Sequence, residues 1–268
     1  MMAYTDIGDP VHKFYNHDAI DFAIKMPNGF FDLTLTSPPY EDARLHSGTL
    51  SGEAWVDWAT TLFMELHRIT AGATIFVVEG RTRNFEYSCA PMKLAADLSR
   101  AGIKMRKPLV YHRIGIPGSG GPDWFRNDWE FVLCATHGKL PWSDQKAIGH
   151  APVAKSGKFT HRKTDGTRVD RPPPKPYTAN HGNIFHGKVG KGQMGSDFAH
   201  QNTAPYPEWL CDPLIRSLCP PDGIVLDPMG GSGTTIAVAA KLGRKWTYND
   251  VDETQCRLAA TRLSAIPH

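Results

Sequence analysis

Short apolar runs alternate along this chain with longer segments in which apolar residues recur at helical spacing. A run of about four to eight apolar and β-branched residues is typical of a buried strand, whereas residues 55–69 place their apolar side chains on one face of a helix. The alternation predicts an α/β fold with a doubly wound, mostly parallel sheet. The expected strands lie at 11–18, 31–36, 73–78, 104–112, 129–136, 223–227 and 246–250, and the expected helices at 19–26, 55–69, 91–101, 208–218, 233–242 and 252–263.

The strand at 31–36 ends abruptly in the turn Ser37-Pro38-Pro39-Tyr40. Two prolines make this turn stiff, because proline fixes its own φ, has no N–H and forces the preceding residue into extended geometry. The turn follows the carboxyl end of a strand, where open α/β sheets bind ligands. Its backbone carbonyls can accept hydrogens from an exocyclic amine, and Tyr40 offers a ring face for stacking on a planar base. An ordinary Pro-Pro turn covered by a packed tyrosine is the alternative.

A second strand, at 223–227, runs into a glycine-rich turn and then into the start of a helix. Such a turn lets a ligand approach the backbone closely and places it near a helix N-terminus. The next strand ends at an acidic residue, Asp250, where folds of this type bind ribose hydroxyls. The candidate ligand-binding residues of the turn are Asp227, Pro228, Gly230, Gly231, Ser232, Gly233 and Thr234.

Together, the two stretches resemble the amino-group DNA methyltransferases, which methylate exocyclic amines with S-adenosylmethionine. In that family the turn (Asp/Asn/Ser)-Pro-Pro-(Tyr/Phe) is catalytic, and Asp-Pro-Phe-x-Gly-Ser-Gly-Thr binds the cofactor. This chain departs mildly from the second motif, with Met229 and Gly230 in place of Phe and the variable residue. Its catalytic motif precedes its cofactor motif, as in the permuted β group. The resemblance covers most of the chain and implies a Rossmann-like methyltransferase fold with S-adenosylmethionine as the cofactor.

The resemblance also implies ligand roles outside the two motifs. Asp18, at the end of the first strand, matches a family residue that binds the cofactor adenine, although it is also suited to cap the helix that follows. Asp250 matches the ribose-binding acid. The family commonly has Gly where this chain has Tyr248, so the approach of the ribose is expected to differ.

Two further stretches carry a family likeness. The tryptophan-bearing helix at 55–69 contacts the adenine in the family, but its apolar spacing favours core packing here. An Arg and a Glu flank the start of one family strand, and Arg126 and Glu130 match them before and at the start of the strand at 129–136.

Positive charge is concentrated in one segment of the chain. The net charge of all 268 residues is +3, but residues 138–200 hold eleven Lys and Arg against four Asp, which leaves −4 for the remainder. This segment is rich in Gly and Pro and has no clear period, so we expect an irregular insertion whose charge suits DNA phosphates. A disordered linker is the alternative. The candidate DNA-binding residues are Arg44, in the polar loop after the proline turn, and Lys155, Lys158, Arg162, Lys163, Arg168 and Arg171.

We therefore expect three parts in the chain. Residues 1–137 form the catalytic half of the methyltransferase domain, residues 138–200 the insertion, and residues 201–268 the cofactor-binding half. The β group has its target recognition region at the place of the insertion.

Composition disfavours several other functions. The five cysteines and 12 histidines show neither disulfide nor metal-ligand spacing, so we expect no metal site, and a reducing cytoplasm fits best. No apolar run approaches the roughly 20 residues that span a bilayer, and the first residues do not resemble a signal peptide. No Pro-Cys dipeptide occurs, which disfavours methylation at carbon 5 of cytosine.

We expect a site-specific enzyme that flips a base out of duplex DNA and methylates the N4 amine of cytosine. Ser37 favours cytosine, because a hydroxyl is shorter than a carboxylate or amide and both donates and accepts hydrogen bonds. Family members with Ser at this position are mostly N4-cytosine enzymes. The N6 amine of adenine stays open, as do an RNA or protein-amide substrate and a non-catalytic DNA-binding relative. A homodimer and a cognate restriction nuclease are compatible with this function.

Overall fold

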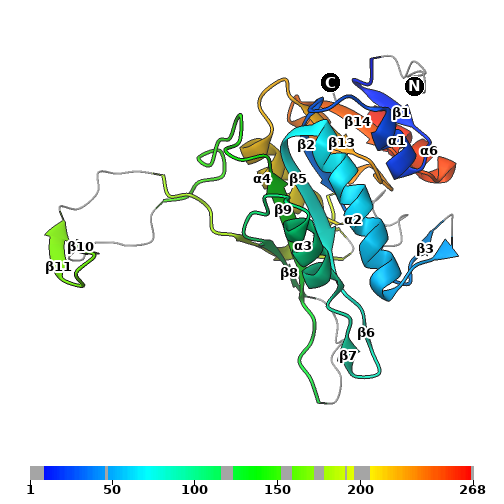
Figure 1. Cartoon of the computed structure of the whole chain (residues 1–268). Coiled ribbons are helices and arrows are strands. Elements are labelled where there is room, and N and C mark those ends of the chain that lie inside the picture. Colours follow the sequence, from blue (N-terminus) through cyan, green and yellow to red (C-terminus); the bar gives the residue numbers. More distant parts are fainter. Residues whose placement is uncertain are drawn as a thin grey trace.

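The computed structural model describes residues 9–45, 48–115, 123–151, 159–171, 178–190, 192–195 and 206–266. Within these ranges, eight strands form one sheet in the order β1-β14-β13-β2-β5-β9-β8-β12 (Figure 1). Its strands are β1 (Lys13–Tyr15), β2 (Phe31–Thr36), β5 (Thr70–Val78), β8 (Leu109–Ile114), β9 (Trp129–Thr136), β12 (Ile184–Lys188), β13 (Ile224–Asp227) and β14 (Lys245–Asn249). The same ranges contain three hairpins: β3 (Arg44–Leu45) with β4 (Gly48–Thr49), β6 (Thr82–Arg83) with β7 (Glu86–Tyr87), and β10 (Phe159–Arg162) with β11 (Arg168–Arg171).

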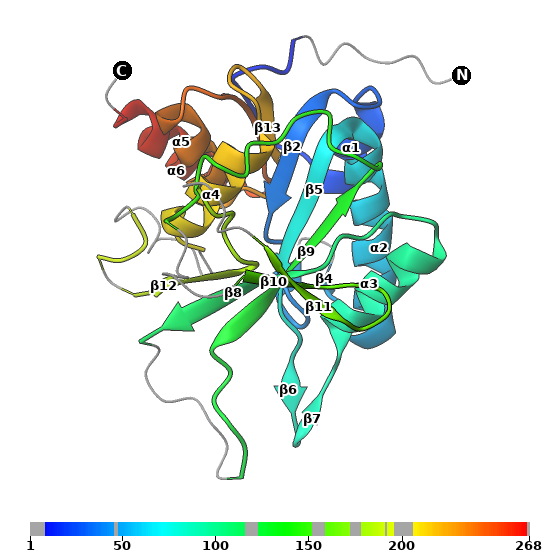
Figure 2. The same cartoon turned by 90° about the vertical axis from the view of Figure 1, so that its left-hand side faces the viewer.

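Helices cover both faces of the sheet (Figure 2). One layer consists of α1 (Ala19–Lys25), α2 (Gly52–Ile69) and α3 (Ala90–Arg100), and the other of α4 (Glu208–Leu218), α5 (Thr234–Lys241) and α6 (Glu253–Ser264). Strands between two apolar layers need apolar side chains on both faces. In β5, Ile75 and Val77 belong to the core under α4 to α6, whereas Phe76 and Val78 belong to the core under α1 to α3. Burial on both faces explains why the strands appear in the sequence as continuous apolar runs.

The sheet reverses its winding between β2 and β13. From β2 the chain crosses through α2 to β5 on one side, and from β13 it crosses through α5 to β14 on the other side. β2 and β13 themselves are paired in parallel. Ligands bind at such a switch point, outside the carboxyl ends of the strands. The proline turn and the glycine-rich turn leave these two carboxyl ends and are therefore neighbours.

Among the described strands of this sheet, β9 runs against its neighbours, because it pairs antiparallel with both β5 and β8. Its first residues, and not its last, therefore lie at the carboxyl edge of β5. The strand predicted at 104–112 starts later than expected, at Leu109, directly after Pro108, which has no N–H for a ladder. The segment 138–200, expected to lack regular structure, contains β10, β11 and β12, and β12 joins the main sheet beside β8. These strands of four or five residues are too short to give a readable period.

Composition also gave expectations about membrane-spanning helices and metal sites, and the following statements on them concern the described ranges only. There, the helices lack the length and apolar character needed to cross a membrane. In the same ranges, no three His, Cys, Asp or Glu side chains are grouped as they would be around a metal ion.

Gly72 provides a test of the packing between β5 and β2. A Cβ built on Gly72 would lie 2.0 Å from the backbone oxygen of Asp32, and the Asp32 side chain also accepts a hydrogen bond from the Ile224 N–H at 2.8 Å. Since its pairing partner strand and this hydrogen bond prevent Asp32 from moving away from the new Cβ, Gly72→Ala should lower the free energy of unfolding by about 2 kcal/mol. Urea denaturation measures this loss. Gly182→Ala, where no atom lies within 4 Å of the new Cβ, should leave stability unchanged.

Candidate functional site

Helix α2 fixes the proline turn through a hydrogen bond. The Trp55 indole, which is buried, donates a hydrogen bond from Nε1 to the Pro39 oxygen at 2.9 Å. Pro38 is buried, whereas Ser37 and Tyr40 are partly exposed. Trp55 is thus packed in the core, as the apolar spacing of its helix favoured, and it also contacts the turn directly. The helix fixes the backbone of the turn and leaves Ser37 and Tyr40 accessible.

Tyr40 is oriented by a buried carboxylate at the start of β9. Its hydroxyl donates to Glu130 Oε2 at 2.6 Å, and Glu130 Oε1 pairs with Arg113 Nη1 at 2.7 Å. Burial, followed by the Glu130 carboxylate, raises the pKa of Tyr40, so the phenol stays a protonated donor. Burial also raises the pKa of Glu130, and Arg113 opposes that shift. The ring of Tyr40 is therefore fixed at both ends, by the turn and by Glu130.

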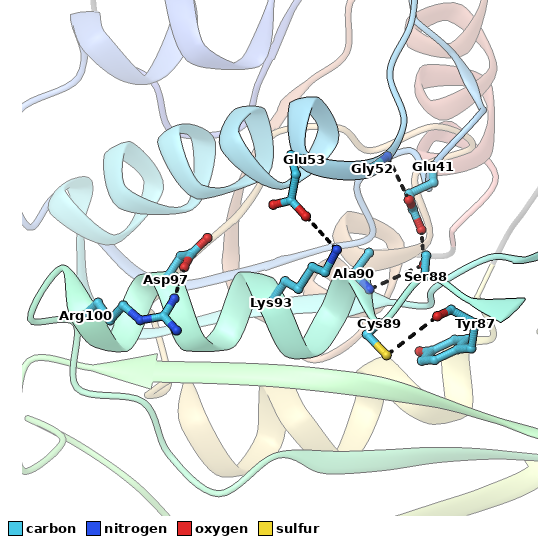
Figure 3. A network of polar contacts seen from close by, with 10 residues as sticks. All are labelled: Glu41, Gly52, Glu53, Tyr87, Ser88, Cys89, Ala90, Lys93, Asp97 and Arg100. Atoms are coloured by element: carbon cyan, nitrogen blue, oxygen red, sulfur yellow. Dashed lines mark hydrogen bonds and ion pairs between the residues drawn. The ribbon is translucent and has the colours of Figure 1, made fainter.

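Glu41, the residue after Tyr40, ties the proline turn to two other elements (Figure 3). It is buried, and its Oε1 accepts from the Gly52 N–H at 3.0 Å at the start of α2. Its Oε2 accepts from the Ser88 hydroxyl and from the Arg81 N–H at 3.2 Å, at the two ends of the β6–β7 hairpin. A buried carboxylate with several donors is stable as a charge. It fixes the turn, the start of α2 and the hairpin relative to one another.

The glycine-rich turn depends on glycine for packing at two positions. A Cβ at Gly230 would lie 2.3 Å from the Tyr248 ring, which is fully buried and donates its hydroxyl to the Gly231 oxygen at 2.7 Å. A Cβ at Gly233 would lie 2.8 Å from that of Ala259, and the φ of Gly233 is +77°. Tyr248, noted in the sequence as a departure from the family, therefore lies beneath the turn and supports it.

Asp250 and Asn249 hold the turn from β14. Asp250 Oδ2 accepts from the Gly231 N–H at 2.8 Å, and its Oδ1 from the Asp252 N–H at 2.9 Å. The buried Asn249 amide donates to the oxygens of His17 and Pro228, each at 2.9 Å. One side chain thus joins the ends of β1 and β13. Sequence analysis did not single out Asn249, because an amide at a strand end has no distinctive signature.

Arg262 of α6 clamps the far side of the same turn. The side chain is buried, and its Nη1 donates to the Ser232 oxygen at 3.2 Å and to the Thr234 hydroxyl at 2.9 Å. Its Nη2 pairs with Glu208 at 2.8 Å, and Glu208 also pairs with Lys241 at 2.6 Å. The residues Ser232 and Thr234 of the predicted cofactor motif are therefore fixed by a cation that follows them by some thirty residues.

Asp227 lies at the bottom of the site, buried at the end of β13. The Tyr206 hydroxyl lies 3.2 Å from its Oδ2 and also contacts the Thr235 hydroxyl. Burial raises the pKa of Asp227 to about 6, and hydrogen bonds from Thr235 and Tyr206 oppose that shift. Thr235 in turn lies 3.4 Å from the Leu35 oxygen of β2. This chain of contacts links the glycine-rich turn to the strand that ends at the proline turn.

Asp18 caps helix α1. Its Oδ1 accepts from the Ile20 N–H at 2.8 Å and from the Asp21 N–H at 3.2 Å, and its side chain is exposed. The cap, which was one of the two interpretations, is present, and it leaves the second carboxylate oxygen for another role. Because Asn249 binds the neighbouring His17, Asp18 lies beside the glycine-rich turn.

The predicted DNA-binding residues are not gathered at this edge. Arg162, Lys163 and Arg168 belong to the β10–β11 hairpin, which projects away from the sheet (Figure 1). Arg44 lies in β3 and Arg171 at the end of β11, but their side chains lie outside the described part. Lys155 and Lys158 lie outside the described residues altogether. Of the other pair with a family likeness, the Arg126 guanidinium lies 3.5 Å from the Asp128 carboxylate, and Glu130 pairs with Arg113.

The arrangement presents two kinds of surface around one switch point. A half-exposed hydroxyl and an aromatic ring, Ser37 and Tyr40, lie on the β2 side. Carboxylates at Asp18 and Asp250 and a backbone turn with closely packed glycines lie on the β1, β13 and β14 side. A polar, cationic ligand with hydroxyls suits the second surface, and a planar base suits the first.

Comparison with known proteins points to the same family as the motifs. The sequence profile of the DNA methylase family, N6 and N4 type, matches residues 31–261. The type II methyltransferase M.ScaI of Streptomyces caespitosus is 26% identical over 97% of this chain and 85% of its own length. The DNA adenine methyltransferase YhdJ of Escherichia coli K12 is 24% identical over 98% of this chain and 86% of its own length.

Solved structures share the fold. The PvuII DNA methyltransferase, described as cytosine-N4-specific, matches 95% of this chain and 88% of its own with a TM-score of 0.71 and 18% identity. The DNA modification methylase TTHA0409 of Thermus thermophilus, complexed with S-adenosyl-L-methionine, matches 96% of this chain and 98% of its own with a TM-score of 0.60 and 19% identity. These likenesses confirm the predicted doubly wound, Rossmann-like fold.

The buried carboxyl of Asp227 provides a pH test of the site. Its folded pKa, about 6, lies above the ordinary 3.8, so the folded state holds the proton more tightly than the unfolded chain does. The stability that this proton confers is complete below the unfolded pKa and is lost as pH rises through the folded pKa. Because asparagine does not titrate, Asp227→Asn should gain about 2 kcal/mol relative to wild type between about pH 4 and pH 7.

Urea denaturation at both pH values measures the difference. Asp57→Asn, at an exposed position on α2, is the control and should follow the wild type at both pH values. A difference between Asp227→Asn and wild type that does not change with pH would contradict the raised pKa.

Proposed function

The chain belongs to the N6/N4 DNA methylase family, and from that premise we propose that it transfers a methyl group from S-adenosylmethionine to the N4 amine of cytosine in duplex DNA. The resemblance noted in the two motifs is confirmed at the level of the family, whereas the permuted β-group order stays a prediction. DNA amino-methylation with S-adenosylmethionine follows from the family. The choice of cytosine rests on one observation, the hydroxyl of Ser37 at the head of the proline turn.

The amino nitrogen of a base is a poor nucleophile, because its lone pair is delocalised into the ring. The proline turn supplies what this nitrogen needs: Ser37 and the Pro38 carbonyl accept the amino hydrogens while the nitrogen becomes tetrahedral. Tyr40 stacks on the flipped base, and its bond to Glu130 fixes the ring plane that the base meets. Bound S-adenosylmethionine would supply the methyl group: as the C–N bond forms, the C–S bond breaks, the sulfonium becomes a neutral thioether, and the amino nitrogen loses one proton to solvent. A dry aromatic pocket favours this loss of the sulfonium charge.

The surface around the glycine-rich turn would hold S-adenosylmethionine. We assign the ribose hydroxyls to Asp250 and the adenine to Asp18. The rest of the cofactor would be held by the residues of the turn, Asp227, Pro228, Gly230, Gly231, Ser232, Gly233 and Thr234. Support comes from the hydrogen bonds by which Asp250 and Arg262 already shape this turn. The two Asp250 oxygens accept the Gly231 and Asp252 N–H groups, so the carboxylate is held at the edge of the turn.

The basic segment 138–200 supplies the phosphate contacts. Arg162, Lys163 and Arg168 stand together on the β10–β11 hairpin, where the register places Arg162 opposite Arg168. Two like charges on neighbouring strands repel each other, and a phosphate between them removes that repulsion. We therefore propose this segment as the target recognition part, with Lys155, Lys158 and Arg171 as further members. Arg44, in the loop after the proline turn, is a further candidate for a phosphate contact.

Adenine is the second candidate substrate, and a specific observation favours it. YhdJ, which is named an adenine methyltransferase, is similar to this chain over nearly all of its length. Against it stands the likeness to the PvuII enzyme, named cytosine-N4-specific. Type II methyltransferases such as M.ScaI belong to restriction systems by name, while M.BamHII of Bacillus amyloliquefaciens is named an orphan, so a partner nuclease stays open.

The target base is tested with labelled S-adenosylmethionine and unmethylated duplex DNA, followed by hydrolysis and separation of the nucleosides. We expect the label in N4-methyldeoxycytidine. Ser37→Ala should lower turnover about tenfold, the effect of one lost hydrogen bond, without weakening cofactor binding. Label found only in N6-methyldeoxyadenosine would overturn the cytosine assignment and leave the family unchanged.

The cofactor site is tested by calorimetry with S-adenosylmethionine. Asp250→Ala should weaken binding by roughly tenfold or more, because it removes the ribose acceptor and frees the Gly231 N–H. The control is Asp252→Ala: Asp252 caps α6 through the Thr254 N–H at 2.8 Å and lies two residues away. Equal affinities for wild type and Asp250→Ala would remove Asp250 from the site.

A further inference from the structure

Two projections leave the catalytic edge of the sheet and carry exposed aromatic side chains at their ends. The β6–β7 hairpin carries Phe85, which is 86% exposed, and the segment that leads into β9 carries Trp124 and Phe125, which are 76% and 85% exposed. Both projections point downward from the same edge in Figures 1 and 2. Solitary exposed apolar residues are common, but three large exposed aromatic rings on two projections that point the same way call for a partner.

The backbone at Phe85 shows that folding does not account for this residue. Asn84 and Phe85 are the two central residues of the hairpin, with φ values of +52° and +65°. Such a turn favours Asn-Gly, because the left-handed region costs a residue with a large side chain conformational free energy. Phe85 bears that cost while burying almost none of its ring. An outlier of this kind, unexplained by packing, indicates a contact made outside the folded chain.

The hairpin is anchored to the catalytic turn itself. Glu41, which follows Tyr40, accepts hydrogen bonds from Arg81 and Ser88 at the two ends of the hairpin, and Asp42 pairs with Arg81. Tyr87 donates its hydroxyl to Glu79 at 2.7 Å, at the end of β5. The position of Phe85 is therefore tied to that of the residues that receive the target base.

The second projection is anchored to the same turn from the other side. It ends at Glu130, which binds the Tyr40 hydroxyl, and Asp128 just before it lies 3.5 Å from Arg126 and 3.7 Å from His112. Trp124 and Phe125 meet edge to face, with ring centroids 5.7 Å apart. The two rings form one rigid aromatic end.

Charge on both projections is nearly balanced. Arg83 lies opposite Glu86 in the hairpin, Asp123 precedes Trp124, and Arg126 pairs with Asp128. A phosphate-binding surface would carry an excess of Lys and Arg. Balanced charge with exposed rings suits base faces, since every base offers a π-face and stacks on an aromatic side chain regardless of sequence.

We propose that Phe85, Trp124 and Phe125 stack on the bases that lose their neighbour when the target nucleotide is flipped, and so stabilise the opened duplex. The proposal rests on the proposed function, because it takes the flipped base to be bound at Ser37 and Tyr40. Removing a base from the stack leaves a gap whose walls are exposed base faces. Aromatic side chains inserted at such a gap replace the lost stacking, as apolar wedges do in proteins that open a duplex. Both projections are tied by hydrogen bonds to the catalytic turn, through Glu41 and through Tyr40.

The test compares binding to two DNA duplexes of one sequence, intact and with a single abasic site that imitates the gap. The variants are Phe85→Gly and the double variant Trp124→Ser/Phe125→Ser, and the control is Ile24→Ala, which removes an exposed side chain on α1. Wild type and control should prefer the abasic duplex by about tenfold, and both variants should lose most of that preference. Phe85→Gly should melt no lower than wild type, because glycine suits the left-handed turn. A structural role for Phe85 would instead lower the melting temperature.

Activity separates this inference from the proposed function. On native duplex DNA the variants should transfer labelled methyl groups about tenfold more slowly than wild type, and on heat-denatured DNA at the wild-type rate. Wild type that transfers no label to either DNA would refute the proposed function, and the binding preference would still test the stacking. Variants that keep the abasic preference would overturn the inference. If the variants instead change the oligomeric state, the rings contact a second copy of the chain, and the stacking inference is equally overturned.

Discussion

The parallel pairing of β2 with β13 is the contact on which the rest of the site depends. Val225 lies opposite Leu33 and Leu226 opposite Thr34, so the ends of the two strands, and the turns that leave them, are held side by side. Both strands are buried on both faces, and a slip of one residue would exchange the side chains of the two cores. The hydrophobic cores therefore do more than stabilise the chain. They set the distance between the proline turn and the glycine-rich turn.

Buried polar side chains complete what the sheet begins. Glu41, Asn249 and Arg262 each bind polar groups from two or more elements, and each is more than nine-tenths buried. Removing one partner of a buried charged pair typically costs about 3–5 kcal/mol, because the other partner is left unpaired. The two turns are consequently rigid before any ligand arrives. A rigid turn spends little of the binding energy of its ligand on ordering itself.

The sequence was informative where structure is local. The apolar runs, the proline turn and the glycine-rich turn each lie within about ten residues, and each was located correctly. The partners of these turns were not predictable, because Glu130 and Arg262 come from elements far along the chain and their residue types are common. The antiparallel course of β9 was missed for a similar reason, since an apolar run does not encode strand direction. The short strands β10 to β12 were missed because four or five residues are too few to show a period.

The reversed direction of β9 bears on how an enzyme of this kind diversifies. The chain leaves the sheet at the end of β8 and re-enters it at the start of β9 on the same edge, and the β6–β7 hairpin also leaves and returns on that edge. Such excursions can lengthen, shorten or exchange their tips without changing the register of a single strand. The tips of these excursions are thereby separated in the fold from the two turns at the switch point. Selection can act on the excursions while the two turns stay unchanged.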